Sequence, residues 1–181
     1  MDTDKKLKEL ILYIADKCKE DHSFGATKLN KILFLADMNA YAFRGTPITG
    51  AKYMHKPNGP VAKRMLPACE ALRKEKRAEI KQENYLGFIK KKVVPLKGAN
   101  VSMFTEEELS IVNMAIEETR SYSATQLSQW THTLNPWLLS SDGEEIPYSS
   151  VFVLLRLPIE EDGISWAKKE IRRLGLSANA A

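Results

Sequence analysis

The stretch TKLNKILFLADMNAYAFRG, residues 27–45, has the apolar pattern of a helix that buries one face. Its apolar residues recur at spacings of three and four, and the inward stripe comprises Leu29, Ile32, Leu33, Ala36, Ala40 and Phe43. Thr27 can cap the start of this helix, and Gly45 can end it, because glycine readily adopts the left-handed conformation at helix C-termini. We therefore predict a core helix over residues 27–45.

Asp37 lies at the edge of this stripe. An acidic residue there either hydrogen-bonds to a neighbouring backbone group or projects into a groove. We favour the first interpretation, because buried polar groups are normally satisfied.

Further helices are predicted on both sides of this one. Residues 4–19 carry a second apolar stripe, and residues 60–78 predict a third helix, with Pro60 in its first turn and a kink at Pro67. Thr105 with Glu108 and Ser123 with Gln126 have the spacing of capping boxes, so helices should begin there. We expect Pro136 to close the second of these. A last helix is predicted over residues 164–174.

Two segments rich in β-formers predict a small sheet. Residues 51–55 form a short extended run, and residues 80–97 suggest two strands interrupted by the lysines of residues 90–92. We expect these to join in one antiparallel sheet. The predicted fold class is mainly α (α+β), a compact bundle of about six or seven helices with an antiparallel sheet of two or three strands. Residues 1–160 form the domain, and the C-terminal helix and frayed tail of residues 161–181 pack on it.

Composition describes an ordinary globular chain of 181 residues, with 44% hydrophobic and 28% charged residues. No run approaches the roughly 18 apolar residues of a membrane span, and the N-terminus lacks the pattern of a secretory signal, so we expect a cytoplasmic protein with no membrane partner. The net charge of +4 permits contact with nucleic acid or an acidic protein surface but requires neither.

Reaction and metal motifs are missing from the sequence. It contains no glycine-rich phosphate loop, nucleophile elbow or HExxH helix, and its three histidines have no zinc-site spacing. Cys18 and Cys69 are expected to be buried free thiols. We predict no enzyme activity, no metal and no cofactor. A hydrolase or transferase built on Asp37, His55 and His132 remains the alternative.

Two blocks of the chain resemble a known family. The first is KLNKILFLADMNAYAFRGTPITGAKYMHKPNGPV, residues 28–61, and the second, residues 104–148, contains FTEEEL, THTLNPW and GEEIPY. In this order they are similar to the SocA-like Panacea antitoxin domain, once described as a phage-associated domain of unknown function. The resemblance is strongest over residues 28–148.

This resemblance implies an antitoxin that binds and neutralises a cognate toxin protein, usually encoded beside it. The SocA branch is also associated with presenting its toxin to an ATP-dependent protease. The implied partner-binding residues are Asp37, Tyr53, His55, Pro57, Asn58, Gly59, His132 and Trp137. The family often has an aromatic residue at the position of Asn58. Because asparagine has no aromatic ring, the resemblance does not imply a stacking role for Asn58.

The residue types agree with a binding module, because Tyr53, His55 and Trp137 are expected in loops or at element ends, where anchors are displayed. Gly59 is expected to supply a backbone angle or a close approach that a β-carbon would obstruct. The main rival is a nucleic-acid-binding regulator that uses the basic residues 73–77 and 90–92, although we expect no nucleic acid partner.

Overall fold

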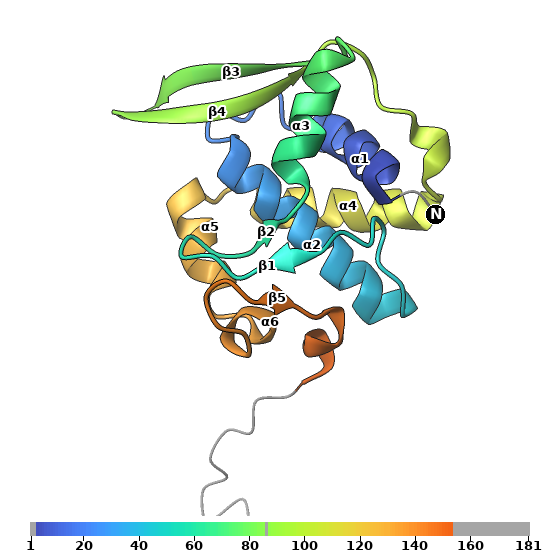
Figure 1. Cartoon of the computed structure of the whole chain (residues 1–181), viewed down its shortest axis with the longest axis vertical. Helices are drawn as coiled ribbons and strands as arrows, with labels where there is room; N and C mark the ends of the chain where they lie inside the picture. The colour runs from blue at the N-terminus through green and yellow to red at the C-terminus, as the bar shows by residue number, and fades with distance from the viewer. Residues whose placement is uncertain (1–2, 86, 154–181) are drawn as a thin grey trace, which may run out of the picture.

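The computed structural model describes residues 3–85 and 87–153, and within them it confirms a mainly helical fold with small antiparallel sheets (Figure 1). The α-helices are α1 (Thr3–Lys17), α2 (Ala26–Arg44), α3 (Met65–Lys74), α4 (Glu106–Thr119), α5 (Ala124–Thr131) and α6 (Asn135–Leu138). The strands are β1 (Tyr53–Met54), β2 (Val61–Ala62), β3 (Ala78–Tyr85), β4 (Phe88–Pro95) and β5 (Glu145–Ile146). Two short 3₁₀ helices complete the described part, η1 (Val101–Met103) and η2 (Tyr148–Phe152).

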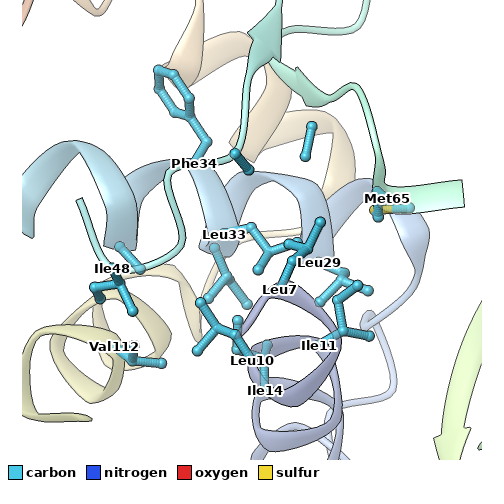
Figure 2. Packing of buried hydrophobic residues seen from close by; sticks show 14 of the residues in the cluster. Leu7, Leu10, Ile11, Ile14, Leu29, Leu33, Phe34, Ile48, Met65 and Val112 are labelled. Atoms are coloured by element: carbon cyan, nitrogen blue, oxygen red, sulfur yellow. The ribbon is translucent and has the colours of Figure 1, made fainter. Parts of the chain in front are cut away.

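Helix α2 is the central element of the core and packs against α1, α4 and α5. Leu29 and Leu33 of α2 are fully buried and belong to one hydrophobic cluster with an apolar face of α1 and Val112 of α4 (Figure 2). The left-handed C-cap at Gly45 is confirmed by its φ of 71°. Two details of the prediction are wrong. The N-cap is Gly25, two residues before the predicted cap Thr27, and Phe43 is 67% exposed in the last turn of the helix.

The strands form two sheets, so the prediction of a single sheet is wrong. One is three-stranded in the order β2-β1-β5, and the other is the β3-β4 hairpin. Tyr53 of β1 pairs with Ala62 on one side and Ile146 on the other. Because β1 pairs along both edges, it offers no edge to the hairpin. In Figure 1 the hairpin lies beside α3 at one end of the molecule, and α6 and β5 lie at the other.

The three prolines predicted to start, bend or end a helix have other roles in this fold, so the predicted helix start at Pro60 is wrong as well. Val61 and Ala62 after Pro60 form β2, and α3 begins only at Met65. Pro67 is the third residue of α3, within the first turn, where proline's missing N–H is tolerated. Helix α5 ends at Thr131, before Pro136 is reached, and Pro136 is the second residue of the next helix, α6. The predicted kink and the predicted stop are therefore wrong.

Both capping boxes are confirmed. The Thr105 hydroxyl accepts from the Glu108 N–H at 3.2 Å, and the Glu108 carboxylate accepts from the Thr105 N–H at 3.0 Å. Ser123 and Gln126 make the same reciprocal pair at 3.3 and 2.9 Å. These bonds satisfy N–H groups that a helix start otherwise leaves unpaired, so α4 and α5 begin where the sequence predicts.

The predicted C-terminal helix over residues 164–174 and the boundary at residue 160 lie outside the described residues. Among the described helices, none combines the length and the apolar character that crossing a membrane requires. Cys18 and Cys69 are buried free thiols, as predicted, and burial raises the pKa of each to about 11.

Candidate functional site

Asp37 and Tyr53, two of the predicted site residues, lie together in the core. The Asp37 carboxylate accepts from the Thr49 N–H at 2.7 Å, the Thr49 hydroxyl at 2.5 Å and the Tyr53 hydroxyl at 2.8 Å. Both Asp37 and Tyr53 are 0% exposed, and burial is the main reason that their pKa values are raised. The favoured interpretation of Asp37 as a satisfied buried carboxylate is therefore confirmed.

Tyr53 lies at an element end, as expected, because it is the first residue of β1, but the expectation that it is displayed to a partner is wrong, because its side chain is fully buried. Tyr53 belongs to the middle strand of a sheet, and its ring packs edge-on against Phe34 of α2 at 5.3 Å between centroids. Tyr148 closes the same cluster by donating to the Ala51 carbonyl at 2.6 Å and lying 3.4 Å from the Asp37 carboxylate. This cluster joins α2, β1 and η2, so it supports the scaffold beneath the site.

His55, His132 and Trp137 form a stacked aromatic group. The imidazole rings of His55 and His132 each lie 4.1 Å from the Trp137 ring, at interplanar angles of 26° and 17°. His55 follows β1, His132 is the C-cap of α5, and Trp137 is in α6, so three separate segments meet here. The nitrogen Nδ1 of His55 lies 3.0 Å from the Ser140 hydroxyl, which fixes the orientation of that ring.

The turn after His55 carries the remaining predicted residues. Pro57 and Asn58 are exposed, whereas Gly59 is buried with a φ of +93°. A β-carbon at Gly59 would lie 2.6 Å from Nζ of Lys31 and 2.7 Å from the hydroxyl of Thr131. Position 59 therefore needs glycine for both its backbone angle and its close packing, which confirms the expectation from the sequence.

Lys31 holds this turn, and the sequence reasoning missed it. Its side chain is 1% exposed, and Nζ donates to the carbonyls of Asn58 at 2.5 Å and Pro60 at 3.3 Å. Among the described residues no carboxylate lies within ion-pair distance of Lys31, and burial lowers its pKa to about 8. Ser128 of α5 also donates to the Asn58 carbonyl, at 3.0 Å. The turn is thus clamped to α2 and α5.

A signal for Lys31 was present in the sequence. Phe34, Leu35 and Met38 extend the apolar surface of α2 well beyond the predicted stripe, and all three are buried. A helix that is apolar nearly all round is buried nearly all round, so lysines in its first half must find partners inside the protein.

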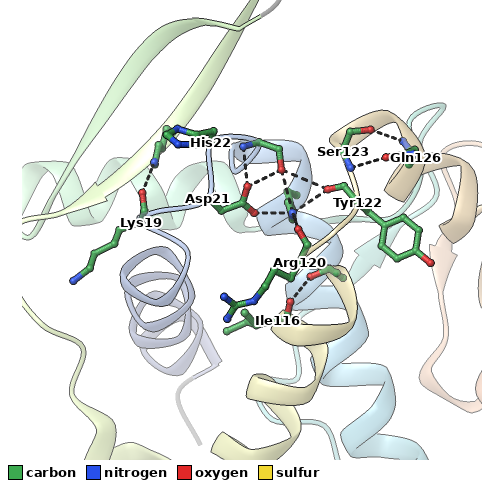
Figure 3. A network of polar contacts seen from close by, with 12 residues as sticks. Lys19, Asp21, His22, Ile116, Arg120, Tyr122, Ser123 and Gln126 are labelled. Atoms are coloured by element: carbon green, nitrogen blue, oxygen red, sulfur yellow. Dashed lines mark hydrogen bonds and ion pairs between the residues drawn. The ribbon is translucent and has the colours of Figure 1, made fainter.

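Lys28 provides the second internal clamp and positions α5. It forms an ion pair with Asp21 at 2.6 Å and donates to the carbonyls of Tyr122 at 2.9 Å and Arg120 at 3.1 Å. Figure 3 shows this network between the start of α2 and the connection from α4 to α5. Because α5 begins directly after Tyr122, the network fixes the helix that carries His132.

Two polar atoms beside the turn are buried without a partner. Among the described residues, neither Nε2 of His132 nor Nε1 of Trp137 makes a hydrogen bond. The pKa of His132 is lowered, first by burial and then by the charges of Lys31 and His55, which favours a neutral imidazole. Unsatisfied groups of this kind are uncommon in native proteins, and they mark the stack as a place where a further molecule or water can bond.

The predicted basic surface is partly occupied within the chain. Lys90 donates to the His22 carbonyl at 2.5 Å, and Lys92 donates to the Lys19 carbonyl at 3.0 Å. Arg77 forms an ion pair with the buried Glu9 at 2.6 Å. These contacts engage part of the predicted basic surface within the chain, while Arg73, Lys91 and Lys92 line one pocket between α3 and the hairpin.

The described residues also offer little for the catalytic alternative. They contain no group of three or more acidic, histidine or cysteine side chains that could hold a metal. Within them no hydrogen bond joins Asp37 to His55 or His132, because Asp37 belongs to the Tyr53 cluster and the histidines to the Trp137 stack.

Comparison with known proteins gives one match. A family model described as "Antitoxin SocA-like, Panacea domain" matches residues 29–138, more than half of the chain and the run from α2 to α6. No curated protein and no solved structure matches the chain.

Proposed function

This chain belongs to the SocA-like antitoxin family with a Panacea domain, and we propose from that premise that it neutralises a cognate toxin by direct protein–protein contact. Membership of this family implies a role in a toxin–antitoxin system. That neutralisation occurs through direct contact with the toxin is our proposal. The observation that supports it best is the position of the family match, which spans both the turn after His55 and the segment from His132 to Trp137. We further propose that the toxin is encoded in the same operon and that the two proteins meet in the cytoplasm.

The region proposed to bind the toxin, which we call the turn–stack face, comprises the exposed Pro57 and Asn58, the partly exposed His132 and Trp137, and the buried His55 and Gly59 that support them. Its exposed tip, Pro57 and Asn58, sits on a turn held by Lys31 and Ser128. A rigid turn loses little conformational entropy on binding, which favours affinity. Aromatic side chains are also the usual anchors of interfaces. Asp37 and Tyr53 contribute indirectly, by supporting β1 beneath this face.

The buried Nε1 donor of Trp137 adds a second argument. Nε1 of Trp137 can only donate a hydrogen bond, and it has no acceptor among the described residues. A small shift of the stack that brings a toxin carbonyl or carboxylate within reach would satisfy it. The proposed face therefore suits a partner that presents acceptor oxygens.

The test is co-expression of this chain with the product of the neighbouring gene, followed by purification of the pair. The proposal predicts restored growth and a stable complex. It also predicts that the purified antitoxin inhibits the purified toxin with no protease present. Growth arrest in cells with well-expressed soluble antitoxin contradicts the proposal. Rescue in cells without inhibition in the purified pair favours delivery to an ATP-dependent protease.

A further inference from the structure

A groove runs between α2, α5, α6 and η2, with a volume of about 360 Å³. Its lining is mostly apolar and includes Phe34, Met38, Trp130, Leu134, Pro136 and Val151. For comparison, an empty apolar cavity of about 150 Å³ is large enough to bind benzene. The groove therefore has room for two or three large apolar side chains.

Exposed apolar side chains continue from this groove along both of its C-terminal elements. Leu138 and Leu139 follow the groove residue Pro136 and are 49% and 46% exposed. Phe152 and Val153 follow the groove residue Val151 and are 59% and 44% exposed. Helix α6 and η2 are in contact. Soluble monomers seldom leave several large apolar side chains exposed beside an apolar groove, so an occupant is expected.

The last described residue of the chain lies close to this groove. Asn135 lines the groove, and its side-chain amide donates to the carbonyl of Val153, the last described residue, at 2.7 Å. Val153 therefore lies close to the rim of the groove, and the sequence continues for residues 154–181. Because an extended chain spans roughly 3.3 Å per residue, the ten residues of 154–163 are ample to reach any part of the groove.

We propose that residues 164–174 of this chain dock in the groove as an amphipathic helix. Their sequence ISWAKKEIRRL places Ile164, Ala167, Ile171 and Leu174 at spacings of three and four, the pattern of one apolar helix face. Lys168 flanks that face, and the exposed Glu118 lines the groove, so the charges are complementary. Attachment to the rim also gives the segment a high effective concentration, which favours it over a second copy of the chain.

This inference concerns a surface apart from the turn–stack face and does not depend on the identity of a toxin. It also accounts for the C-terminal helix that the sequence predicts to pack on the same domain. The docked segment would cover Trp130 and Leu134, which line the groove on either side of His132 in the sequence.

Hydrogen exchange on the full-length chain tests the proposal. The variant Ile171→Asp with Leu174→Asp places two charges on the apolar face of the segment. The control, Lys169→Asp with Arg173→Asp, places two aspartates on the opposite face of the same predicted helix. We expect amide exchange over residues 135–153 to rise by about tenfold in the first variant and to stay unchanged in the second, because only the first removes the cover. Amides of residues 29–40 in α2 serve as the internal reference for global stability.

Every other outcome overturns the proposal. Equal exchange over residues 135–153 in the unsubstituted chain and both variants means that the segment does not cover the groove. Protection that grows with protein concentration identifies a second copy of the chain as the occupant. An equal rise in both variants, with α2 unaffected, means that charge rather than the apolar face governs the effect.

Discussion

Tyr53 and Asn58 are five residues apart, yet one lies in the core and the other in solvent. Tyr53 is held between two strands and bonds to the buried Asp37, whereas Asn58 is at the tip of a turn whose backbone alone is fixed. The two roles are separate because β1 ends at Met54, and the chain then turns away from the sheet before it reaches Asn58. The first region determines stability, and the second is available to a partner.

The contrast is sharpest at Tyr53 itself. We expect Tyr53→Ala to lower the free energy of unfolding by about 3–5 kcal/mol, the usual cost of removing a buried aromatic ring. Tyr53→Phe should cost about 1–2 kcal/mol, because Asp37 loses one donor while the ring stays. Urea unfolding followed by circular dichroism measures both. A Tyr53→Ala variant that keeps its stability but loses toxin binding would show that Tyr53 contacts the toxin and does not support the core.

Glycine substitutions separate close packing from backbone angle in the turn. Gly59 and Gly143 have φ values of +93° and +82°, but only Gly59 has neighbours within 4 Å of an added β-carbon. Gly143→Ala should therefore cost about 1–2 kcal/mol for the left-handed backbone alone. Gly59→Ala should cost about 2–4 kcal/mol, because crowding against Lys31 and Thr131 is added. Equal losses in thermal or urea unfolding would mean that Lys31 does not pack tightly against the turn.

The buried ammonium of Lys31 links the two regions and should show in the pH dependence of stability. Its pKa in the folded chain is about 8, below its ordinary value of 10.5, so the unfolded chain binds more protons between these values. Stability should therefore rise by about 1 kcal/mol from pH 8 to pH 9 through this group, and should not change through it below pH 7.

The variant Lys31→Met has no ammonium at this position. The difference in free energy of unfolding between this variant and the unsubstituted chain should therefore change by about 1 kcal/mol from pH 8 to pH 9. Urea unfolding at a series of pH values measures it. A difference that is the same at pH 7 and pH 9 would show that the ammonium is hydrated and does not clamp the turn as described.

Local signals explain how much of this structure the sequence predicts. The capping boxes at Thr105 and Ser123, the C-cap at Gly45 and the strained turn at Gly59 each depend on a few neighbouring residues, and all are confirmed. The pairing of β1 with β5 joins segments about ninety residues apart, and β5 lies in a polar stretch with no strand pattern of its own. Sequence periodicity carries no information on such a pairing.

The candidate site shows the same limit. The resemblance brought together His55, Gly59, His132 and Trp137, which the structure places side by side. It could not separate Tyr53 from them, because burial of that ring depends on β5 and η2, which are distant in sequence. Lys31 escaped notice because a lysine is expected at a surface unless the whole helix is known to be covered.

The central claim is that the toxin contacts the turn–stack face, and calorimetric titration of the toxin with two histidine variants tests it most directly. His132→Ala alters the stack, and His22→Ala makes the same change at an exposed position beside the β3-β4 hairpin, where the contact from Lys90 uses only the His22 backbone. With both variants shown to be folded by circular dichroism, we predict that His132→Ala raises Kd by about tenfold and that His22→Ala leaves it unchanged, because binding energy is concentrated in a few anchors. Loss of binding in His22→Ala, with full affinity in His132→Ala, would contradict the account and move the interface to the hairpin.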